Sequence, residues 1–500
     1  MENVESRDGS SLTHESTQLE CRRVLLTSVS DFPGPLAAFV EITKWAVQKG
    51  DHVYIGLWAD KTIFSDSCSI TARWLARLIR IETPHESVKR VLENVFRNND
   101  KVNFIELPKN RSGRYHIARG RRISIEELQS QTFMYDGESY AIGASLIDGT
   151  RKSLSSATFR RTIINKFKDS YEGLVTEVTN IIKTNGIDTV VAFNGRRAHD
   201  HAILVAAELC KSRTEIYEMG ATNSHLDLYS HGTHDRNALQ KRMKMESQKL
   251  SHSELAFAQE WFTNRVQHLN TEANRFIKKQ ITGEGICAVE NKKDIVYFVS
   301  SLDELASIGP EWGSPFGTQE KALKLINQLI EERPDFRLVV REHPFMGQMD
   351  RKSLTNWREF LASLESTTVI KADSSVDSYE LINSAHAVIS FGSTAGIEAS
   401  YMGVPTLLIA PSFYDDLGVC EIAKNEKELR EWLLNPKLPD NSLAGCQAYA
   451  NFMLNRGTFV KGMEVLSPLH ATSSLGLIGI PSNWKRPLIM VENRMRRMFW

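Results

Sequence analysis

Two apolar runs in the second half of the chain each stop at a short polar motif, and this pairing constrains the fold more than any other feature. Residues 337–340 run into Arg341-Glu342-His343-Pro344, and residues 387–391 run into Gly392-Ser393-Thr394. Short apolar runs of this kind are typical of buried strands, and a helical pattern follows the second motif at once. We therefore predict parallel strands whose carboxyl ends carry both motifs, which is where open α/β sheets bind nucleotides.

Residue spacing in the first motif favours an anion site. Side chains alternate along an extended segment, so Arg341 and His343 share one face while Glu342 points away. Pro344 lacks an N–H group and restricts His343 to extended geometry, so the strand stops there. Arg341 and His343 can then contact the same anion. An edge ion pair followed by a turn is the alternative interpretation.

The second motif favours a phosphate and a ribose. The turn at Gly392 and Ser393 places backbone donors at a helix N-terminus, where the helix dipole favours phosphate. Thr394 and Glu398 then share a helix face, with Gly396 between them. A carboxylate buried among alanines and an isoleucine is costly alone, and two ribose hydroxyls would satisfy it. The alternative is that this segment only caps a helix.

The run from 295 to about 433 resembles the C-terminal half of GT-B glycosyltransferases that build bacterial capsules and related surface polysaccharides. The pieces that carry the likeness are Ser300-Ser301-Leu302-Asp303-Glu304, the His-Pro motif, residues 393–399 and Gly403-Val404-Pro405. The resemblance implies that the His-Pro motif and the Ser/Thr and Glu of the later motif hold the nucleotide of an activated sugar. Users of CMP-sugars and CDP-glycerol share the His-Pro element, and we expect a CMP-, CDP- or UDP-linked donor as substrate, with no other cofactor.

Strand-like and helix-like segments alternate along the chain and predict an α/β protein with two doubly wound, Rossmann-like domains facing a cleft. We predict a disordered tail at 1–20 and an N-terminal acceptor-side domain with connector helices at 21–285. A C-terminal nucleotide-sugar-binding domain follows at 286–435, and a helical extension at 436–500. The resemblance implies that this arrangement is the GT-B architecture, in which final helices pack back on the first domain.

Composition excludes several classes of protein. The 500 residues include 61 basic and 61 acidic side chains, so the chain is not built to bind nucleic acid. No apolar stretch is long enough to span a bilayer, and the first twenty residues lack the apolar region of a secretory signal. Six scattered cysteines fit reduced thiols. We expect a cytoplasmic protein.

Cations and large apolar groups are mixed between residues 484 and 500. This mixture suits peripheral contact with the inner face of a membrane that carries a lipid-linked acceptor. A solvated helix is the alternative.

The first half of the chain should supply the acceptor site and a general base. Glu218 follows a strand-like segment and precedes Gly220, and it resembles a Glu-x-Gly element that some capsule transferases place at the cleft. Such a carboxylate can deprotonate an acceptor hydroxyl. Asp136 is the second candidate for this base, and Arg196 in Asn194-Gly195-Arg196 can contact acceptor or phosphate. An exposed loop glutamate beside a turn glycine is the alternative interpretation of Glu218.

Phosphate contacts and charge stabilisation do not require a metal in this scheme. Ser300 and Ser301 lie on the first loop of the donor domain and can donate to phosphate oxygens. Arg341, His343 and the helix N-terminus can offset the charge on the leaving phosphate, so we predict metal-independent transfer.

A metal site in a phosphohydrolase is the rival interpretation. The residues it would use are His199, Asp200, His201, His225, His231, His234 and Asp235. His199 and His201 stand two apart in a predicted helix, so their side chains diverge.

The function that fits best is transfer of a sugar from a nucleotide-sugar donor to a surface polysaccharide or glycolipid acceptor, as in capsule or lipopolysaccharide biosynthesis. Two alternatives stay open. One is a nucleotide-sugar epimerase of the 2-epimerase type, which would place several acid/base groups around the sugar. The other is a non-catalytic nucleotide-sugar-binding subunit of a polysaccharide assembly complex, which would tolerate loss of Glu218 and Asp136.

Overall fold

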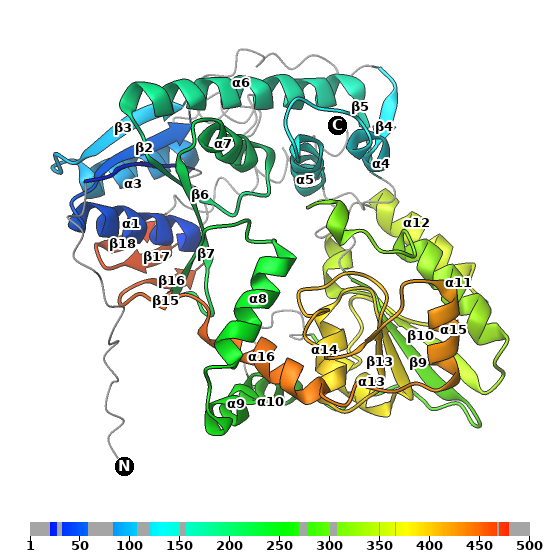
Figure 1. Cartoon of the computed structure of the whole chain (residues 1–500). Coiled ribbons are helices and arrows are strands. Elements are labelled where there is room, and N and C mark those ends of the chain that lie inside the picture. Colours follow the sequence, from blue (N-terminus) through cyan, green and yellow to red (C-terminus); the bar gives the residue numbers. More distant parts are fainter. Residues whose placement is uncertain are drawn as a thin grey trace.

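The computed structural model describes residues 21–27, 33–58, 84–107, 120–150, 157–269, 279–300, 308–349, 351–365, 367–467 and 470–479. In these ranges helices and strands form two lobes, each built on its own sheet (Figure 1). None of their helices is long and apolar enough to cross a membrane. The predicted tail at 1–20 and the basic, aromatic end at 484–500 lie outside the described residues, so both stay predictions.

The N-terminal lobe is built on a seven-stranded sheet in the order β15-β8-β7-β6-β1-β2-β3. From β7 to β3 neighbouring strands are parallel. Strand β8 runs antiparallel to β7, and β15 runs antiparallel to β8. The strands are β1 (Arg23–Leu26), β2 (His52–Trp58), β3 (Val102–Leu107), β6 (Thr189–Phe193), β7 (Arg213–Met219), β8 (His225–Tyr229) and β15 (Thr458–Phe459). The central strands are apolar runs because helices cover both of their faces.

Two groups of helices form these two layers. Side chains of α1 (Pro33–Gln48) and α3 (Pro84–Phe96) pack on the face that holds Val24 and Leu26. Side chains of α5 (Glu138–Thr150), α6 (Arg161–Asn185) and α7 (Ala198–Leu209) pack on the face that holds Leu25 and Val190. Beside α5 and α6 lie a two-stranded antiparallel sheet and a short helix. They are β4 (Arg122–Ser124), α4 (Ile125–Gln129) and β5 (Thr158–Arg160).

The C-terminal lobe has an entirely parallel sheet in the order β11-β10-β9-β12-β13-β14. Its strands are β9 (Lys293–Phe298), β10 (Phe336–Arg341), β11 (Thr367–Ile370), β12 (Ala387–Ser390), β13 (Thr406–Leu408) and β14 (Glu421–Ile422). Numbered by their order in the chain, these strands follow the 3-2-1-4-5-6 arrangement of a Rossmann sheet. The second and third strands are added on one side of β9 and the later ones on its other side, so the strand order reverses between β9 and β12. Both lobes therefore confirm the predicted pair of doubly wound α/β units.

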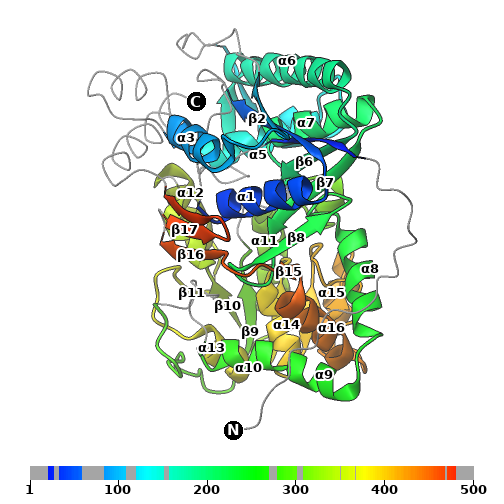
Figure 2. The ribbon, with the colours of Figure 1, turned by 90° about the vertical axis from the view of Figure 1, so that its left-hand side faces the viewer.

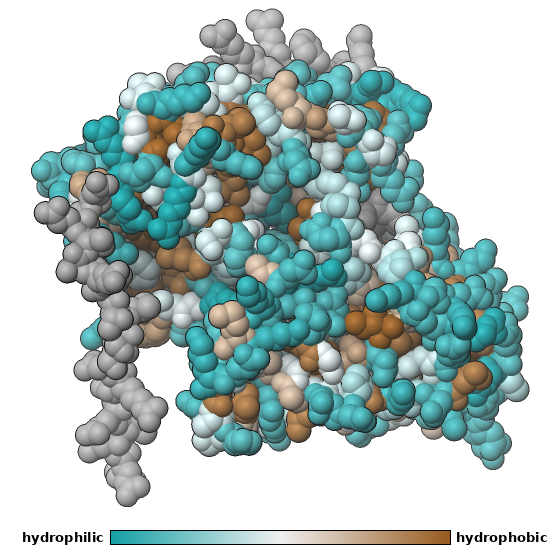
Figure 3. Space-filling model, in the orientation of Figure 1, coloured by the Kyte–Doolittle hydropathy of each residue, from teal (hydrophilic) through white to brown (hydrophobic). Residues whose placement is uncertain are grey.

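Helices again cover both faces of the second sheet. Side chains of α11 (Gln319–Glu331), α12 (Arg351–Ala362) and α15 (Glu426–Leu434) pack on one face. Side chains of α13 (Ser378–Ser384) and α14 (Thr394–Tyr401) pack on the other. Figure 3 shows a largely hydrophilic surface on the side it presents, with hydrophobic residues in small separate groups.

Connector helices join the lobes. They are α8 (Arg236–Ser247), α9 (His252–Ala258) and α10 (Glu260–Val266), and Figure 1 shows α8 running between the lobes. On α8, Arg242 pairs with Asp227 of the first sheet at 3.0 Å, while Arg236 pairs with Asp415 of the C-terminal lobe at 2.6 Å. The connector is therefore attached to both lobes.

The last described segment returns to the first lobe, as expected, but it is only partly helical. Helix α16 (Ser442–Asn455) packs on α8, α9, α10 and α14, after which β15 joins the edge of the first sheet. Strands β16 (Glu464–Ser467), β17 (His470–Ser473) and β18 (Gly476–Gly479) form a three-stranded sheet that contacts α1 (Figure 2). The prediction of a helical extension is therefore corrected, because strands follow α16 in this segment. The apolar residues of these strands cover α1 and the edge of the first sheet.

Candidate functional site

Both motifs of the second half lie at one edge of the C-terminal sheet. Arg341 at the end of β10 and Ser390 at the end of β12 are each paired with Phe298 of β9. Since neighbouring strands are about 4.8 Å apart, the two loops leave the edge roughly 10 Å from each other. They flank the point where the strand order reverses, where open sheets bind ligands.

Arg341 is a buried cation with unused donors. Its residue is 2% exposed, and Nη1 donates to the carbonyl of Lys371 at 2.7 Å. Nε and Nη2 are buried and donate to no residue that the structure describes. Burial lowers the pKa of Arg341 to about 10, so the guanidinium is still charged at neutral pH. An anion would satisfy these two buried donor nitrogens of a cation.

Glu342 is buried and hydrogen-bonded within the C-terminal lobe. Its carboxylate accepts from Trp357 Nε1 at 3.1 Å and from the N–H of Ala372 at 2.9 Å. The shared face of Arg341 and His343 stays a prediction. Burial lowers the pKa of His343 to about 4, and the Arg341 cation lowers it as well. His343 is therefore neutral at physiological pH, so it can donate one hydrogen bond without adding charge.

Helix α14 begins where the second motif predicts. Gly392 has a φ of 79°, a left-handed conformation that favours glycine, and Ser393 caps the helix by accepting from the N–H of Ala395 at 3.3 Å. Thr394 is exposed. Ser393 thus has the capping role of the alternative interpretation, and the exposed hydroxyl of this turn belongs to Thr394.

Gly396 is required by a close contact. A Cβ at this position would lie 2.5 Å from the hydroxyl oxygen of Tyr414, which donates to the carbonyl of Ser393. The glycine therefore has a packing reason that is independent of any ligand.

Glu398 is 6% exposed and already has a partner. Arg265 of α10 donates through Nε to Glu398 Oε1 at 2.7 Å. The sequence analysis missed this arginine, which lies 133 positions away in a charged connector helix. Burial alone would lower the pKa of Arg265, but the Glu398 carboxylate raises it above its ordinary value.

Ser300 is held by its backbone at the end of β9. Its N–H donates to Gln319 Oε1 at 3.0 Å, and its carbonyl accepts from Gln319 Nε2 at 3.2 Å. Ser301 lies outside the described residues, so its predicted phosphate contact stays a prediction.

Glu218 lies near the end of β7, partly buried. Its Oε2 accepts from Asn194 Nδ2 at 2.6 Å, and its Oε1 accepts from the N–H of Met219 at 3.1 Å. Burial raises the pKa of Glu218, while the Asn194 and Met219 hydrogen bonds act against this increase. A raised pKa suits a carboxyl group that takes up a proton during a reaction.

Gly220, the other half of the Glu-x-Gly element, has a structural reason. A Cβ there would lie 2.5 Å from the carbonyl oxygen of Arg456, where the chain returns toward β15. The glycine is needed for this close passage of two backbones.

Asp136 lies at an exposed turn beside a buried histidine. Its Oδ1 accepts from the N–H of Gly137 at 3.0 Å. Burial lowers the pKa of His201 to about 4, against the opposing effect of the Asp136 carboxylate. His201 Nδ1 lies 2.6 Å from the hydroxyl of Tyr171.

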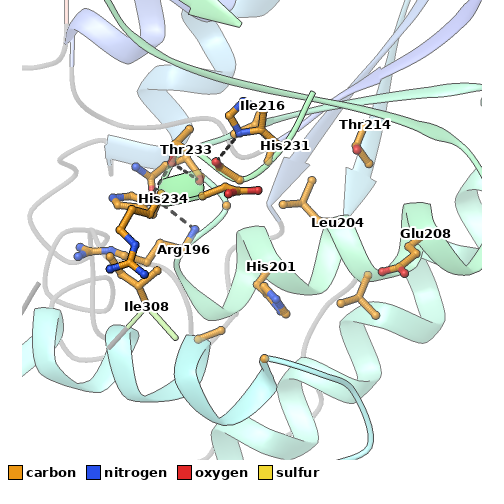
Figure 4. Close-up of a pocket in the computed structure, with 18 of the residues that line it drawn as sticks. Arg196, His201, Leu204, Glu208, Thr214, Ile216, His231, Thr233, His234 and Ile308 are labelled. Atoms are coloured by element: carbon orange, nitrogen blue, oxygen red, sulfur yellow. Dashed lines mark hydrogen bonds between the residues drawn. The ribbon is translucent and has the colours of Figure 1, made fainter. Parts of the chain in front are cut away.

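A cavity of about 910 Å³ joins these N-terminal elements. Its lining includes Gly137 and His201 on one wall, the Asn194 to Arg196 loop on another, and Glu311 from the C-terminal half. Figure 4 shows Arg196 and His234 at one end of the cavity and Glu208 and Thr214 at the other. Other lining residues are Ala141, Leu204, Val205, Lys211, Ser212, Arg213, Ile216, His231, Gly232, Thr233, Asp235, Arg236, Asn237 and Ile308.

Two arginines of this cavity have ion-pair partners. Arg196 binds Asp148 at 3.0 Å, and Arg236 binds Asp415. Burial lowers the pKa of His234 to about 3 and keeps it neutral. The mixture of hydrogen-bonding groups with apolar side chains such as Leu204 and Ile216 suits a ligand rich in hydroxyl groups.

The histidines do not gather as a metal centre would need. Within the described ranges no group of three or more His, Cys, Asp or Glu side chains is placed to hold a metal ion. His199 and His201 both lie on α7, where His199 Nε2 is 3.2 Å from Asp200 Oδ1 while His201 contacts Tyr171. The metal-site alternative therefore finds no cluster among these residues.

The chain matches the sequence model of one protein family and is similar to several solved structures at low sequence identity. The sequence model of a family described as capsule polysaccharide biosynthesis protein matches residues 207–462. The comparison with curated proteins found no match.

Solved structures similar to this chain include three sugar-nucleotide or Kdo enzymes. The KpsC beta Kdo 2,7 transferase of Thermosulfurimonas dismutans is 16% identical, with 64% of this chain and 89% of that chain covered and a TM-score of 0.36. The KpsC beta Kdo 2,4 transferase of the same organism is 13% identical, with 53% and 79% covered and a TM-score of 0.36. The UDP-GlcNAc 2-epimerase of Neisseria meningitidis is 12% identical, with 87% and 96% covered and a TM-score of 0.26.

Proposed function

This chain belongs to the family of capsule polysaccharide biosynthesis proteins, and we propose that it is a glycosyltransferase that moves a sugar from a nucleotide-sugar donor to a glycan acceptor. The observation that carries this proposal is Arg341, a buried guanidinium whose Nε and Nη2 have no acceptor among the described residues. It lies where the second sheet reverses its strand order. This is the place and the chemistry that a donor phosphate requires.

The donor is held by the C-terminal lobe in this proposal. Arg341 and neutral His343 donate to the phosphate from the end of β10, and the N-terminus of α14 with the exposed Thr394 faces it from the end of β12. Glu398 accepts from the ribose. As the glycosidic bond to phosphate breaks, the charge that develops on the leaving oxygen is stabilised by Arg341 and by the helix dipole.

The acceptor is held by the N-terminal lobe, in the cavity lined by Asn194 and Arg196. Glu218, fixed through Oε2 by Asn194 next to this cavity, takes the proton of the attacking hydroxyl. Burial raises the pKa of Glu218 and so makes it a stronger base. Asp136, which neighbours the lining residue Gly137, is the second candidate for this role.

Donor binding is tested by a thermal-shift panel of CMP, CDP, UDP and GDP. We expect one nucleotide to raise the melting temperature by about 2–4 °C at a hundredfold excess over Kd. Arg341→Met and Glu398→Gln should lose this shift. Arg333→Met is the matched control, because Arg333 pairs with Asp335 at the surface of the same lobe. If none of the four nucleotides stabilises the native chain, the donor-site assignment fails.

Transfer is tested with the matching nucleotide sugar and capsular oligosaccharides. Glu218→Gln should lower kcat by about 10²- to 10⁴-fold while nucleotide binding stays unchanged. A loss in Asp136→Asn but not in Glu218→Gln would move the base to Asp136. Full activity in excess EDTA is expected, because the proposed charge stabilisation comes from Arg341 and the helix N-terminus. Interconversion of the nucleotide sugar without acceptor would instead identify an epimerase.

A further inference from the structure

Arg265 reaches Glu398 from a helix that precedes the second sheet in the chain. Its Nε donates to Glu398 Oε1 at 2.7 Å, and its Nη2 lies 2.6 Å from the same oxygen. The Glu398 residue is only 6% exposed. A carboxylate buried to this degree is costly without a cation, and Arg265 supplies that cation.

The two contacts leave one carboxylate oxygen unused. Glu398 Oε2 accepts no hydrogen bond from the residues that the structure describes, and it is not one of the fully buried polar atoms that lack a partner. It is therefore open to solvent. A carboxylate oxygen has two lone pairs, so Oε2 can accept from two neighbouring hydroxyl groups at once.

Aromatic packing fixes the arginine in place. The Arg265 guanidinium lies 4.4 Å from the centre of the Trp261 ring, one helical turn earlier on α10. Phe262 stacks on Tyr401 of α14 at 4.4 Å, and Trp261 meets Tyr449 of α16 at 5.6 Å. Because α10 is packed against the helix that carries Glu398, the ion pair has one defined geometry.

We propose that Arg265 is a positioning residue for donor recognition: it holds one oxygen of Glu398 so that the other accepts the two vicinal hydroxyls of the donor's ribose. This inference rests on the proposed function, since it takes Glu398 to belong to the nucleotide site. It extends the donor site to a connector helix. It also makes the site selective for ribonucleotides over deoxyribonucleotides.

The test compares ribose with 2′-deoxyribose by titration calorimetry on the full chain. The probes are CMP against 2′-deoxy-CMP and UDP against 2′-deoxy-UDP. The native protein should bind the ribonucleotide of one pair about tenfold or more tightly than its deoxy form. Arg265→Met should reduce this preference to less than about threefold, and Arg265→Lys should keep an intermediate preference. Arg333→Met should keep the native preference, because Arg333 also covers an aromatic ring and pairs with a carboxylate, but away from this site.

The double variant Arg265→Met/Glu398→Gln separates positioning from folding. Arg265→Met alone leaves a buried carboxylate unpaired and should melt at a lower temperature. The double variant removes both charges, so it should recover the melting temperature without recovering the ribose preference.

Three results would overturn the proposal. One is a ribose preference that survives in a folded Arg265→Met protein, and another is a native protein that binds both sugars equally. Tighter nucleotide binding by Arg265→Met would also overturn it, since Arg265 would then block the site. Absence of any nucleotide binding to the native chain, in contrast, refutes the donor site of the proposed function itself.

Discussion

Glu138 has a pKa well above that of a glutamate in water. It begins α5, has no solvent exposure, and its Oε1 contacts no hydrogen-bond donor among the described residues. Burial raises the pKa of Glu138 to about 7, and the Glu172 carboxylate contributes to this rise. The folded protein thus holds this side chain as a neutral acid at pH 5 and must ionise it at pH 8.

Replacing Glu138 with Gln should therefore change the pH dependence of stability. A group whose folded pKa is raised contributes stability below its unfolded pKa, near 4.5, and loses it as pH rises through about 7. The melting temperature of Glu138→Gln relative to the native chain should consequently rise between pH 5 and pH 8. Thermal melts at half-unit steps measure this difference.

Asp136→Asn is the control for this prediction, because Asp136 is exposed at the neighbouring turn. Its rise in relative melting temperature between pH 5 and pH 8 should be smaller than that of Glu138→Gln. A flat difference for Glu138→Gln would show that Glu138 is ionised throughout this range.

Helix α14 shows at the scale of one element why glycine is needed in the second motif. The hydroxyl of Tyr414 passes over Gly396 to reach the carbonyl of Ser393, and a Cβ would lie 2.5 Å from this hydroxyl and 2.9 Å from Ser390 Cβ. Gly396→Ala should cost about 1–3 kcal/mol of unfolding free energy. It should also weaken nucleotide binding, since relief of the clash moves either the N-terminus of α14 or the Tyr414 hydroxyl that holds the Ser393 carbonyl.

Gly173 is the matched control, because it is a helical glycine without a steric requirement. It is exposed on α6, and nothing lies within 4 Å of where its Cβ would be. Gly173→Ala should therefore stabilise the chain by about 0.5–1 kcal/mol. Denaturant unfolding measures both variants, and equal signs for the two would contradict the steric explanation of Gly396.

Local sequence was sufficient for the elements on which the site is built. The predicted strand at 337–340 lies within β10 and the one at 387–391 covers β12, because both are apolar runs closed by turn residues. The two motifs lie at the ends of β10 and β12 for the same reason.

Contacts between distant segments could not be predicted in this way. Arg265 meets Glu398 across 133 positions, and no local pattern on α10 distinguishes this arginine from the other charges of the connector. Strand β15 has only two residues and pairs with β8 more than two hundred positions earlier. Such short pairings depend on tertiary packing and leave no periodicity in the sequence.

The whole molecule depends on α8 as the link between its lobes. Arg242 anchors α8 to Asp227 in the first sheet, with Nη1 3.0 and 3.1 Å from the two carboxylate oxygens. Arg236 and Gln240 of the same helix both donate to Asp415 of the C-terminal lobe. Since the proposed acceptor cavity includes Arg236 and Asn237 at the start of α8, the lobe contact also shapes that cavity.

Asp415→Ala should therefore weaken the coupling between the lobes. Asp415 is largely buried, and its loss leaves Arg236 without its ion-pair partner and Gln240 with only the carbonyl of Ser412. We expect a cost of about 2–4 kcal/mol and, in calorimetry, a single unfolding transition that separates into two. Asp416→Ala is the neighbouring control, because Asp416 is exposed and pairs only with Lys244, and it should cost less than about 0.5 kcal/mol. One unchanged transition in Asp415→Ala would mean that α16 and β15, which also connect the lobes, are sufficient to make them unfold together.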